Sequence, residues 1–436
     1  MKTYVFTNRV YPPVGGATGE LLKELAEGLA ADGARVVVVT SRGAKDRWVK
    51  GPRDEGTKGL KDEGTKGLRG EGTETAEAVG DIASPALAGR GQLKGPEVVN
   101  GVEVIRVGTV AFTRASHWRR AWSYLSLYPQ LMWQVWRLGR VEAVVSMTDP
   151  PLQVAAVTLA SCRAGKKIHW AQDVYPELAE ELGVIPRGGL LARLLRAVST
   201  WALRRQDEIV VVGRCMRDRL IRRGVDAGKI EVIANWSPVG AVGAEAVAEM
   251  RERLGWKDKF VVLYSGNIGL AHDFDTIIGA ARLLEGSGVE MVFAGEGPRL
   301  EQLRCDTAGL DHVRFLPPQP KDELGAFLAA ADVHLVTVRA GLEGLVVPSK
   351  AYGILAAGRP MVHVGPAGSE MGRLLAETGA GVSVGNGESA KLAEVLQNLS
   401  RDGEEVRRRG NLAKKAADDY TFPAALRRWR ELVEVG

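Results

Sequence analysis

The sequence predicts two α/β domains, each built on a parallel sheet that helices cover on both faces. Short apolar strands alternate with helical stretches along almost the whole chain, and this alternation favours parallel sheets joined by right-handed crossovers. Segment 34–41, ARVVVVTS, is a continuous apolar run, as is typical of a parallel strand buried on both faces. The alternation breaks once, near 235–258. We therefore expect one doubly wound domain on each side of this break.

The first domain begins with a strand–helix–strand unit. A glycine loop and an amphipathic helix, 15–33, connect the expected strands 2–8 and 34–41. The expected remaining strands of this domain are 102–108, 141–147, 166–173, 207–213 and 229–238. The expected strands of the second domain are 260–269, 289–298, 312–318, 331–338, 360–365 and 380–385. Such sheets bind ligands beyond the carboxyl ends of their strands, so we expect two such edges to face each other across a cleft.

The composition is that of a globular protein with room for two or three cores. The chain has 436 residues, of which 45% are hydrophobic and 25% charged. No run approaches the ~20 apolar residues of a membrane span, and the first residues show no secretory signal. The three cysteines are far apart, so we expect a reducing cytoplasm and neither a disulfide framework nor a metal site. A net charge of +5 permits an anionic partner without naming it.

Residues 45–98 interrupt the first series with a repeat. The heptapeptide DEGTKGL occurs at 54–60 and again at 62–68. The segment is rich in Gly, Glu and Lys and holds too few large apolar residues to order itself. We therefore predict a disordered surface loop here.

This loop gives a first testable prediction. Deleting residues 52–74 should leave the melting temperature and the activity nearly unchanged, because a disordered insertion contributes little to either. Thermal denaturation and turnover of the shortened protein measure both quantities. Loss of soluble protein would contradict the prediction.

A lysine stands where a helix start normally favours negative charge. Segment 341–347 is an apolar loop with one acid, Glu343, and a helix is expected to begin at Pro348. Lys350 then falls in the first turn, where free N–H groups and the helix dipole are already positive. This placement raises the question of which anion the lysine meets.

Several loops that follow strands resemble one enzyme family when taken together. They are YPPVGGA at 11–17, QDVYPE at 172–177, YSGNIGLAHDFDTII at 264–278, AGEGP at 294–298 and VPSKAYGILAAGRP at 347–360. Their order and spacing resemble the GT-B glycosyltransferases of family 4. The nearest resemblance is to bacterial enzymes that add nucleotide-activated sugars during cell-envelope polysaccharide synthesis. It covers nearly the whole chain except about 45–98.

The resemblance implies a fold and a reaction. It implies a GT-B fold, with two Rossmann-like, doubly wound α/β domains that face each other across a cleft. Residues 1–235 would bind the acceptor, 236–415 a nucleotide-diphosphate sugar, and 416–436 would form a helix that packs back on the first domain. Such enzymes generally retain the anomeric configuration and need no metal or other cofactor.

The resemblance also implies site residues. The N–H groups of the helix at Pro348, the Ser349 hydroxyl and the Lys350 charge would hold the diphosphate, and preorganised donors would stabilise it as the sugar leaves. Glu296 and the backbone near Phe315 and Leu316 would lie by the ribose and base, although core packing is the preferred interpretation of the Phe315 side chain. The expected donor-binding residues are Gly15, Gly16, Ser265, Gly266, Asn267, Glu296, Leu316, Ser349 and Lys350. For Gly15 and Gly16, an ordinary tight turn is the alternative.

The chain departs from the family pattern in two places. Many relatives have two glutamates eight positions apart, where this chain has Leu345 and Gly353. Glu343, two residues earlier, is the candidate substitute for the first. Relatives also often carry Arg and Lys in the slots of Asn267 and His272. With two cations missing, Lys350 should carry more of the diphosphate charge.

Asp173 is the candidate group for chemistry on the acceptor. It follows the expected strand stretch KIHWAQ at 167–172, so its carboxylate should face the cleft and orient or deprotonate the acceptor hydroxyl. A helix cap or a loop hydrogen bond is the alternative. His117 and His169 are similar candidates, but His169 lies in an apolar strand, as is typical of a core histidine.

Two basic segments suggest a membrane surface. Residues 112–140 contain five arginines and four tryptophans, 187–206 contain five arginines, and neither segment has an acid. Basic amphipathic helices with interfacial aromatics suit an anionic membrane, whereas core helices with solvated arginines are the alternative. No motif for reading nucleic acid accompanies the charge.

The sequence thus predicts a cytoplasmic glycosyltransferase, peripheral on the inner face of the membrane, with Asp173, Glu343 and Lys350 as its catalytic groups. It would move a hexose or an N-acetylaminosugar, most simply from a UDP-sugar, to a lipid-linked or saccharide acceptor. One rival is a GT-B sugar-nucleotide epimerase, which would act without an acceptor. The other is a catalytically silent scaffold that binds nucleotide sugar, for which Gly353 is the best support.

Overall fold

The computed structural model describes the chain except for residues 14–15, 43–95, 109–116, 238, 241 and 435–436. For 117–123 it describes the helical backbone alone. Most of the predicted repeat loop, 45–98, lies outside the described residues. Its last two residues instead belong to a short strand, Glu97–Val99, which pairs antiparallel at the edge of the first sheet. Its three residues are all exposed, which is why hydrophobic periodicity did not reveal it.

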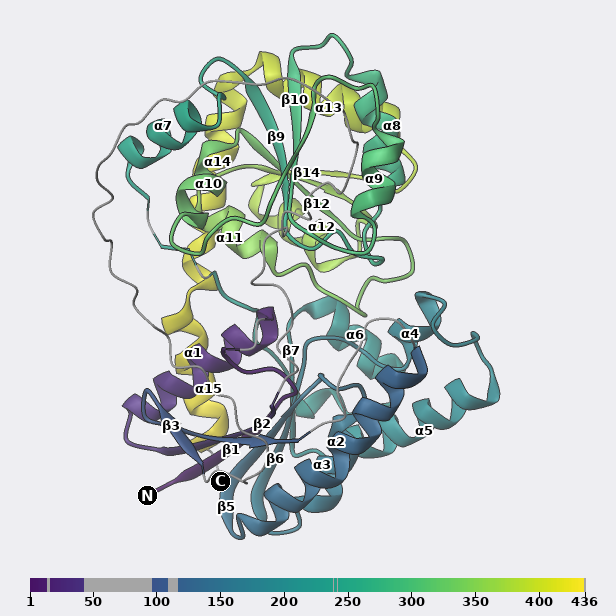
Figure 1. The fold of residues 1–436 in the computed structure, drawn as a ribbon, viewed down its shortest axis with the longest axis vertical. Coiled ribbons are helices and arrows are strands. Elements are labelled where there is room, and N and C mark those ends of the chain that lie inside the picture. Colours follow the sequence, from purple (N-terminus) through teal and green to yellow (C-terminus); the bar gives the residue numbers. More distant parts are fainter. Residues whose placement is uncertain (14–15, 43–95, 109–116, 238, 241, 435–436) are drawn as a thin grey trace, which may run out of the picture.

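Two sheets organise the described residues, as predicted (Figure 1). The first has eight strands in the order β3-β4-β2-β1-β5-β6-β7-β8, and all pairs but β3–β4 are parallel. Their bounds are β1 Thr3–Thr7, β2 Arg35–Ser41, β3 Glu97–Val99, β4 Val102–Val107, β5 Val141–Met147, β6 Ala164–Ala171, β7 Glu208–Val211 and β8 Ile230–Val232. Helices connect them at α1 Ala17–Ala31, α2 His117–Arg137, α3 Gln153–Ala160, α4 Glu177–Glu181, α5 Leu190–Arg204, α6 Arg214–Arg222 and the 3-10 turn Ala227–Lys229.

The second sheet is wholly parallel, with the order β11-β10-β9-β12-β13-β14. Its strands are β9 Phe260–Ser265, β10 Val289–Ala294, β11 Val313–Leu316, β12 Val333–Thr337, β13 Met361–Val364 and β14 Gly381–Val384. The helices of this half are α7 Ala244–Arg253, α8 Asp275–Leu283, α9 Leu300–Asp306, α10 Leu324–Ala330, α11 Lys350–Ala356, α12 Glu370–Thr378, α13 Ser389–Arg401 and α14 Gly403–Ala417. Both orders reverse beside the first strand of the domain, which is the geometry of doubly wound folds.

The last helix, α15 (Phe422–Glu434), joins the core of the first domain. In Figure 1 it continues downward from α14 and runs beside α1. Its apolar face belongs to one buried cluster with β1, β6 and α1. Within that cluster the rings of Trp429 and Trp170 lie 4.9 Å apart and those of Trp170 and Trp236 6.0 Å apart. Burying such large rings makes α15 an integral part of the first domain, because each ring removes much apolar surface from water.

The carboxyl edges of the two sheets meet at the loop between β12 and α11, and ion pairs such as Arg214–Glu370 also cross between them. The N–H of Val174, after β6, donates to the Leu345 carbonyl at 2.9 Å, and Asp173 forms an antiparallel bridge with Val346. Leu345 is fully buried in a cluster with first-domain residues. The loop between β12 and α11 therefore belongs structurally to both domains, which holds the two edges against each other.

Candidate donor and acceptor site

Lys350 is half-buried at the carboxyl edge of the second sheet, and its Nζ is buried without a partner. Its Nζ lies 3.4 Å from the centroid of the Tyr264 ring and makes no hydrogen bond. A cation over an aromatic face is attracted to it, but the ring replaces little of the lost hydration. Burial accordingly lowers the pKa of Lys350 well below its ordinary value. An unpaired buried cation is costly, so this geometry suits a protein that gains its anion from a ligand.

Glycines let the backbones around Lys350 approach each other closely. Gly266, directly after β9, has φ 131°, and a Cβ there would lie 3.3 Å from the Lys350 Nζ. A Cβ on Gly295 would lie 2.0 Å from the Gly266 carbonyl oxygen, which no side chain permits. The loops after β9 and β10 are joined by the Ile268 N–H, which donates to the Glu296 carbonyl at 2.8 Å. The two glycine loops form a single platform beside the ammonium.

His272 stays neutral in this surrounding. Its Nδ1 lies 2.8 Å from the Thr337 carbonyl oxygen. Burial, with the nearby Lys350 charge, lowers the pKa of His272 to about 3. It therefore supplies no positive charge near pH 7, although it occupies the slot where relatives often carry a cation. Lys350 is left as the group of this platform that can carry positive charge, since a bound anion would offset the burial that lowers its pKa.

The helix after the loop begins later than the sequence predicts. Pro348 lies outside it, α11 starts at Lys350, and Ser349 is its N-cap without a side-chain capping bond. Proline is compatible with the first position of a helix, but Pro348 still belongs to the loop between the two domains. The Ser349 hydroxyl remains adjacent to Lys350 in sequence and is only half-buried.

Glu343 braces its own loop. Its carboxylate accepts from the Gly341 N–H at 2.8 Å, and its carbonyl accepts from the Arg219 guanidinium at 3.3 Å. Gly344 beside it has φ 75°, and a Cβ there would lie 2.5 Å from the Cys215 carbonyl oxygen. The glutamate thus fixes a loop that passes against α6, and a catalytic role for it remains a prediction.

The remaining donor-side positions lie at the same sheet edge. Ser265 ends β9, and the Asn267 carbonyl accepts from the Tyr264 hydroxyl at 2.7 Å. Glu296 is exposed after β10, and the Leu316 carbonyl, at the end of β11, accepts from Gly295 N–H at 3.1 Å. Phe315 stacks on Phe293 with ring centroids 5.5 Å apart, which favours core packing for it.

The two glycines of the first domain have separate outcomes. Gly15 lies outside the described residues. Gly16 is the N-cap of α1, with φ 153°, and its carbonyl accepts from the Gly19 N–H at 3.0 Å. A contact between Gly16 and a ligand remains a prediction.

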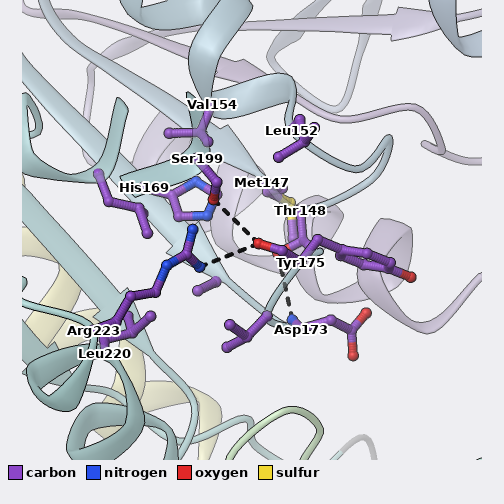
Figure 2. A pocket seen from close by; sticks show the side chains of 13 residues that line it. Met147, Thr148, Leu152, Val154, His169, Asp173, Tyr175, Ser199, Leu220 and Arg223 are labelled. Carbon is purple, nitrogen blue, oxygen red and sulfur yellow. Dashed lines mark hydrogen bonds between the residues drawn. The ribbon is translucent and has the colours of Figure 1, made fainter. Parts of the chain in front are cut away.

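Asp173 lies where the two domains touch. Its backbone N–H faces the Thr148 hydroxyl at 3.5 Å, whereas its carboxylate points away from the pocket drawn in Figure 2. Burial and the nearby Asp149 carboxylate raise the pKa of Asp173 to about 7. A carboxyl with that pKa exchanges protons near neutral pH, as a general base requires.

Arg9 and Asp149 complete this edge and escaped the sequence analysis. Arg9 Nε lies 2.8 and 3.0 Å from the two Asp149 oxygens. Arg9 follows β1 and Asp149 follows β5, which are neighbouring strands. The available signal was their position directly after predicted strands, the same signal that singled out Asp173.

His169 is a core histidine, the alternative that its apolar strand suggests. Its Nδ1 lies 2.9 Å from the Ser146 carbonyl oxygen, and burial lowers its pKa to about 4. Beside it, Ser199 and Arg223 both donate to the Tyr175 carbonyl, at 3.1 and 3.2 Å (Figure 2). This network holds the segment that follows Asp173. The side chain of His117 lies outside the described residues.

Both halves of the chain match glycosyltransferase family models. The glycosyl transferase 4-like domain matches residues 16–236, which is half of the chain, and glycosyl transferases group 1 matches residues 247–416. The chain belongs to the family 4 glycosyltransferases of the GT-B fold. One match contains the strands of the first sheet apart from β1, and the other contains the whole second sheet, in agreement with the resemblance that the loop motifs carry.

Two curated relatives are similar to this glycosyltransferase over about 60% of its length. It is 29% identical over 272 residues to the probable glycosyltransferase WbjE of Pseudomonas aeruginosa, covering 60% of this chain and 67% of the relative. It is 30% identical over 270 residues to the putative colanic acid biosynthesis glycosyl transferase WcaI of Escherichia coli K12, covering 59% and 65%.

Solved structures share the fold of this glycosyltransferase at low identity. Anabaena HepE in complex with UDP has a TM-score of 0.68 at 13% identity, with both chains covered completely. Sucrose-phosphate synthase from Thermosynechococcus elongatus has a TM-score of 0.73 at 14% identity, covering 100% of this chain and 98% of that one. These likenesses establish the GT-B architecture.

Proposed function

We propose that this glycosyltransferase moves a hexose or an N-acetylaminosugar from a UDP-sugar to a lipid-linked or saccharide acceptor in cell-envelope polysaccharide synthesis. The observation that carries the proposal is the buried Lys350 ammonium, which has no partner at the donor edge. A diphosphate would supply the missing anion. One relative named for colanic acid biosynthesis and a structural neighbour solved in complex with UDP and with UDP-glucose support the donor and the pathway class.

The proposed reaction breaks the bond between the sugar C1 and the diphosphate. The bonding electrons move to the phosphate oxygen, where the Lys350 charge would stabilise them in a water-poor site. Asp173 would orient the acceptor hydroxyl and take its proton as the new glycosidic bond forms. In this proposal the anomeric configuration is retained and Lys350 fills the role that a metal ion has in other phosphate sites. The proposed place of work is the cytoplasm, at the inner face of the membrane.

The proposed donor contacts follow from the platform beside Lys350. The glycine loop of Ser265, Gly266 and Asn267 would let the diphosphate approach the backbone closely. Glu296 and Leu316, at the ends of neighbouring strands, would lie toward the ribose and base. Gly353 offers no carboxylate to the ribose, so we expect these neighbours to hold the nucleoside instead.

A ligand screen followed by a turnover assay tests the function. UDP should raise the melting temperature, since a ligand that binds the folded state stabilises it by mass action. Sugar transfer from the UDP-sugar that gives the largest shift should require an acceptor and should survive a metal chelator. The readouts are thermal denaturation and release of UDP.

The same assay separates the rival functions. An epimerase would change the sugar nucleotide with no acceptor present. A silent scaffold would bind UDP-sugars yet turn over none with any acceptor. A melting temperature unmoved by every nucleoside diphosphate would contradict the proposed donor itself.

A further inference from the structure

Helix α5 turns an apolar stripe toward solvent. Leu190, Leu191, Leu194 and Val198 are 85%, 53%, 60% and 37% exposed. The last three of these recur at helical spacing, so they share one face of the helix. The face turned toward the domain carries the buried residues Ala192, Ser199, Ala202 and Leu203. An amphipathic helix normally buries its larger apolar side chains, whereas α5 buries Leu203 near its end and leaves the four stripe residues exposed.

The stripe is part of a larger apolar surface. Helix α3 lies between α2 and α5, and the three form one helical layer over the first sheet (Figure 1). This layer and the residue Val184 before α5 hold nine of the fourteen exposed large apolar side chains among the described residues. Beyond α5 and Val184 they are Leu125, Trp133, Trp136 and Leu159. Such a concentration on one face marks an interaction surface.

The helices of this surface carry an excess of arginines, although Arg187 and Arg196 pair with glutamates of α4. Residues 117–140 and 187–206 contain no Asp or Glu. Arg163 lies over the Trp136 ring at 5.3 Å and Arg205 over the Trp201 ring at 4.6 Å. Arg193 is exposed within the stripe. Arginines with apolar stems beside tryptophans match the boundary between lipid headgroups and acyl chains.

We propose that the outer layer of α2, α3 and α5 docks on an anionic lipid bilayer, with the leucines of α5 inserted at the acyl-chain boundary. The positive charge selects an anionic surface, and the leucines distinguish it from a purely polar anionic partner. Among the described residues no helix has the length and hydropathy to cross a bilayer. In this proposal the protein lies on the membrane surface.

The inner side of α5 connects this surface to the acceptor segment. Ser199 donates to the Tyr175 carbonyl at 3.1 Å, and Tyr175 is two residues after Asp173. Arg223 bridges the same parts, since it donates to the Arg196 carbonyl at 3.0 Å and to the Tyr175 carbonyl at 3.2 Å. This step rests on the proposed function. If the first domain binds the acceptor, docking would place its carboxyl edge next to a lipid-linked substrate.

Vesicle sedimentation with matched variants tests the docking. The protein should sediment with phosphatidylglycerol vesicles and much less with phosphatidylcholine vesicles, and added salt should weaken this. Leu194→Gln should lower the partition coefficient about tenfold, since a leucine would lose its burial in lipid. Leu283→Gln removes a similarly exposed leucine, 55% against 60%, from the other domain and should leave sedimentation unchanged.

The charge is tested with Arg193→Gln, which should weaken binding to anionic vesicles alone. Arg196 is excluded from this test because it already pairs with Glu177 and Glu180. Circular dichroism checks that each variant is folded, and the rise in melting temperature with UDP checks that it still binds the donor nucleotide. Absence of that shift in the parent protein would contradict the proposed donor, whatever the vesicles show.

Equal sedimentation with neutral and anionic vesicles, no sedimentation, or an unaffected Leu194→Gln variant would overturn the docking proposal. If sedimentation velocity instead shows a dimer that Leu194→Gln dissociates, with no vesicle binding, the surface belongs to a second copy and the proposal is equally overturned.

Discussion

Asp173→Asn should lower turnover about a hundredfold or more while affinity for the sugar nucleotide stays unchanged. Asparagine has nearly the same shape but cannot accept a proton, so the change isolates the chemistry from the packing at the domain contact. Steady-state turnover and a separate UDP binding measurement provide the two readouts. Turnover within a few-fold of the parent protein would return Asp173 to a structural role.

The pH profile gives an independent check on Asp173. Because burial and Asp149 raise its pKa to about 7, the carboxyl is protonated in acid, and kcat/KM should fall about tenfold per pH unit below pH 7. The folded chain then binds more protons than the unfolded chain between the ordinary value of 3.8 and about 7, so Asp173 costs stability as pH rises through this window. Asp173→Asn should remove both the fall of kcat/KM below pH 7 and the loss of stability as the pH rises from 3.8 to about 7.

A carboxylate at the other edge of the same sheet is the control. Asp207, before β7, accepts from the Lys167 N–H at 2.7 Å and lies at the amino end of the strands. Asp207→Asn should leave turnover and its pH profile unchanged. An equal effect of both substitutions would mean that Asp173 acts through the stability of the domain.

Lys350→Met should weaken UDP binding by about 1.5–3 kcal/mol, the range of a hydrogen bond to a charged group. Methionine fills much of the same apolar space over Tyr264 but brings no charge. Isothermal titration with UDP measures the loss. Unchanged affinity for UDP and for other nucleoside diphosphates would contradict the assignment of Lys350.

The same substitution should stabilise the ligand-free protein. The Lys350 ammonium is buried without a hydrogen bond, and an unpaired buried charge costs on the order of 1 kcal/mol or more. Lys350→Met should therefore raise the melting temperature without UDP and reduce the shift that UDP causes. Lys391, which is 57% exposed and pairs with Glu394 on the surface, supplies the control, because Lys391→Met should change neither quantity appreciably.

Much of the fold followed from patterns that are local in sequence. Apolar strands separated by helices dictated parallel sheets, because only crossovers can join parallel strands. The position of Asp173 after β6 and of Ser265 at the end of β9 followed from the same reasoning, since strand ends define the sheet edge. Strand β3 escaped it because its three exposed residues carry no periodicity of burial.

The chemical state of the site was decided by tertiary contacts. In sequence Lys350 is one lysine near a helix start, and only the packing of Tyr264 and Gly266 around it makes its charge buried and unpaired. Position alone pointed to Asp149 no more than to its neighbours, yet its proximity adds to the burial that raises the pKa of Asp173. Glu343 is an acid that the sequence offers as a catalytic group, but in the structure its carboxylate accepts a hydrogen bond from the Gly341 N–H of its own loop.

Sequence by itself determined the two doubly wound domains, the loops that carry the candidate site and the basic character of 187–206. Tertiary structure alone decided which face of α5 meets solvent, since the same amphipathic pattern fits a helix that buries its leucines. It also decided that the loop around Leu345 joins the two edges. The physical reason is that periodicity fixes which residues share a face, whereas burial, charge and pKa depend on what packs against that face.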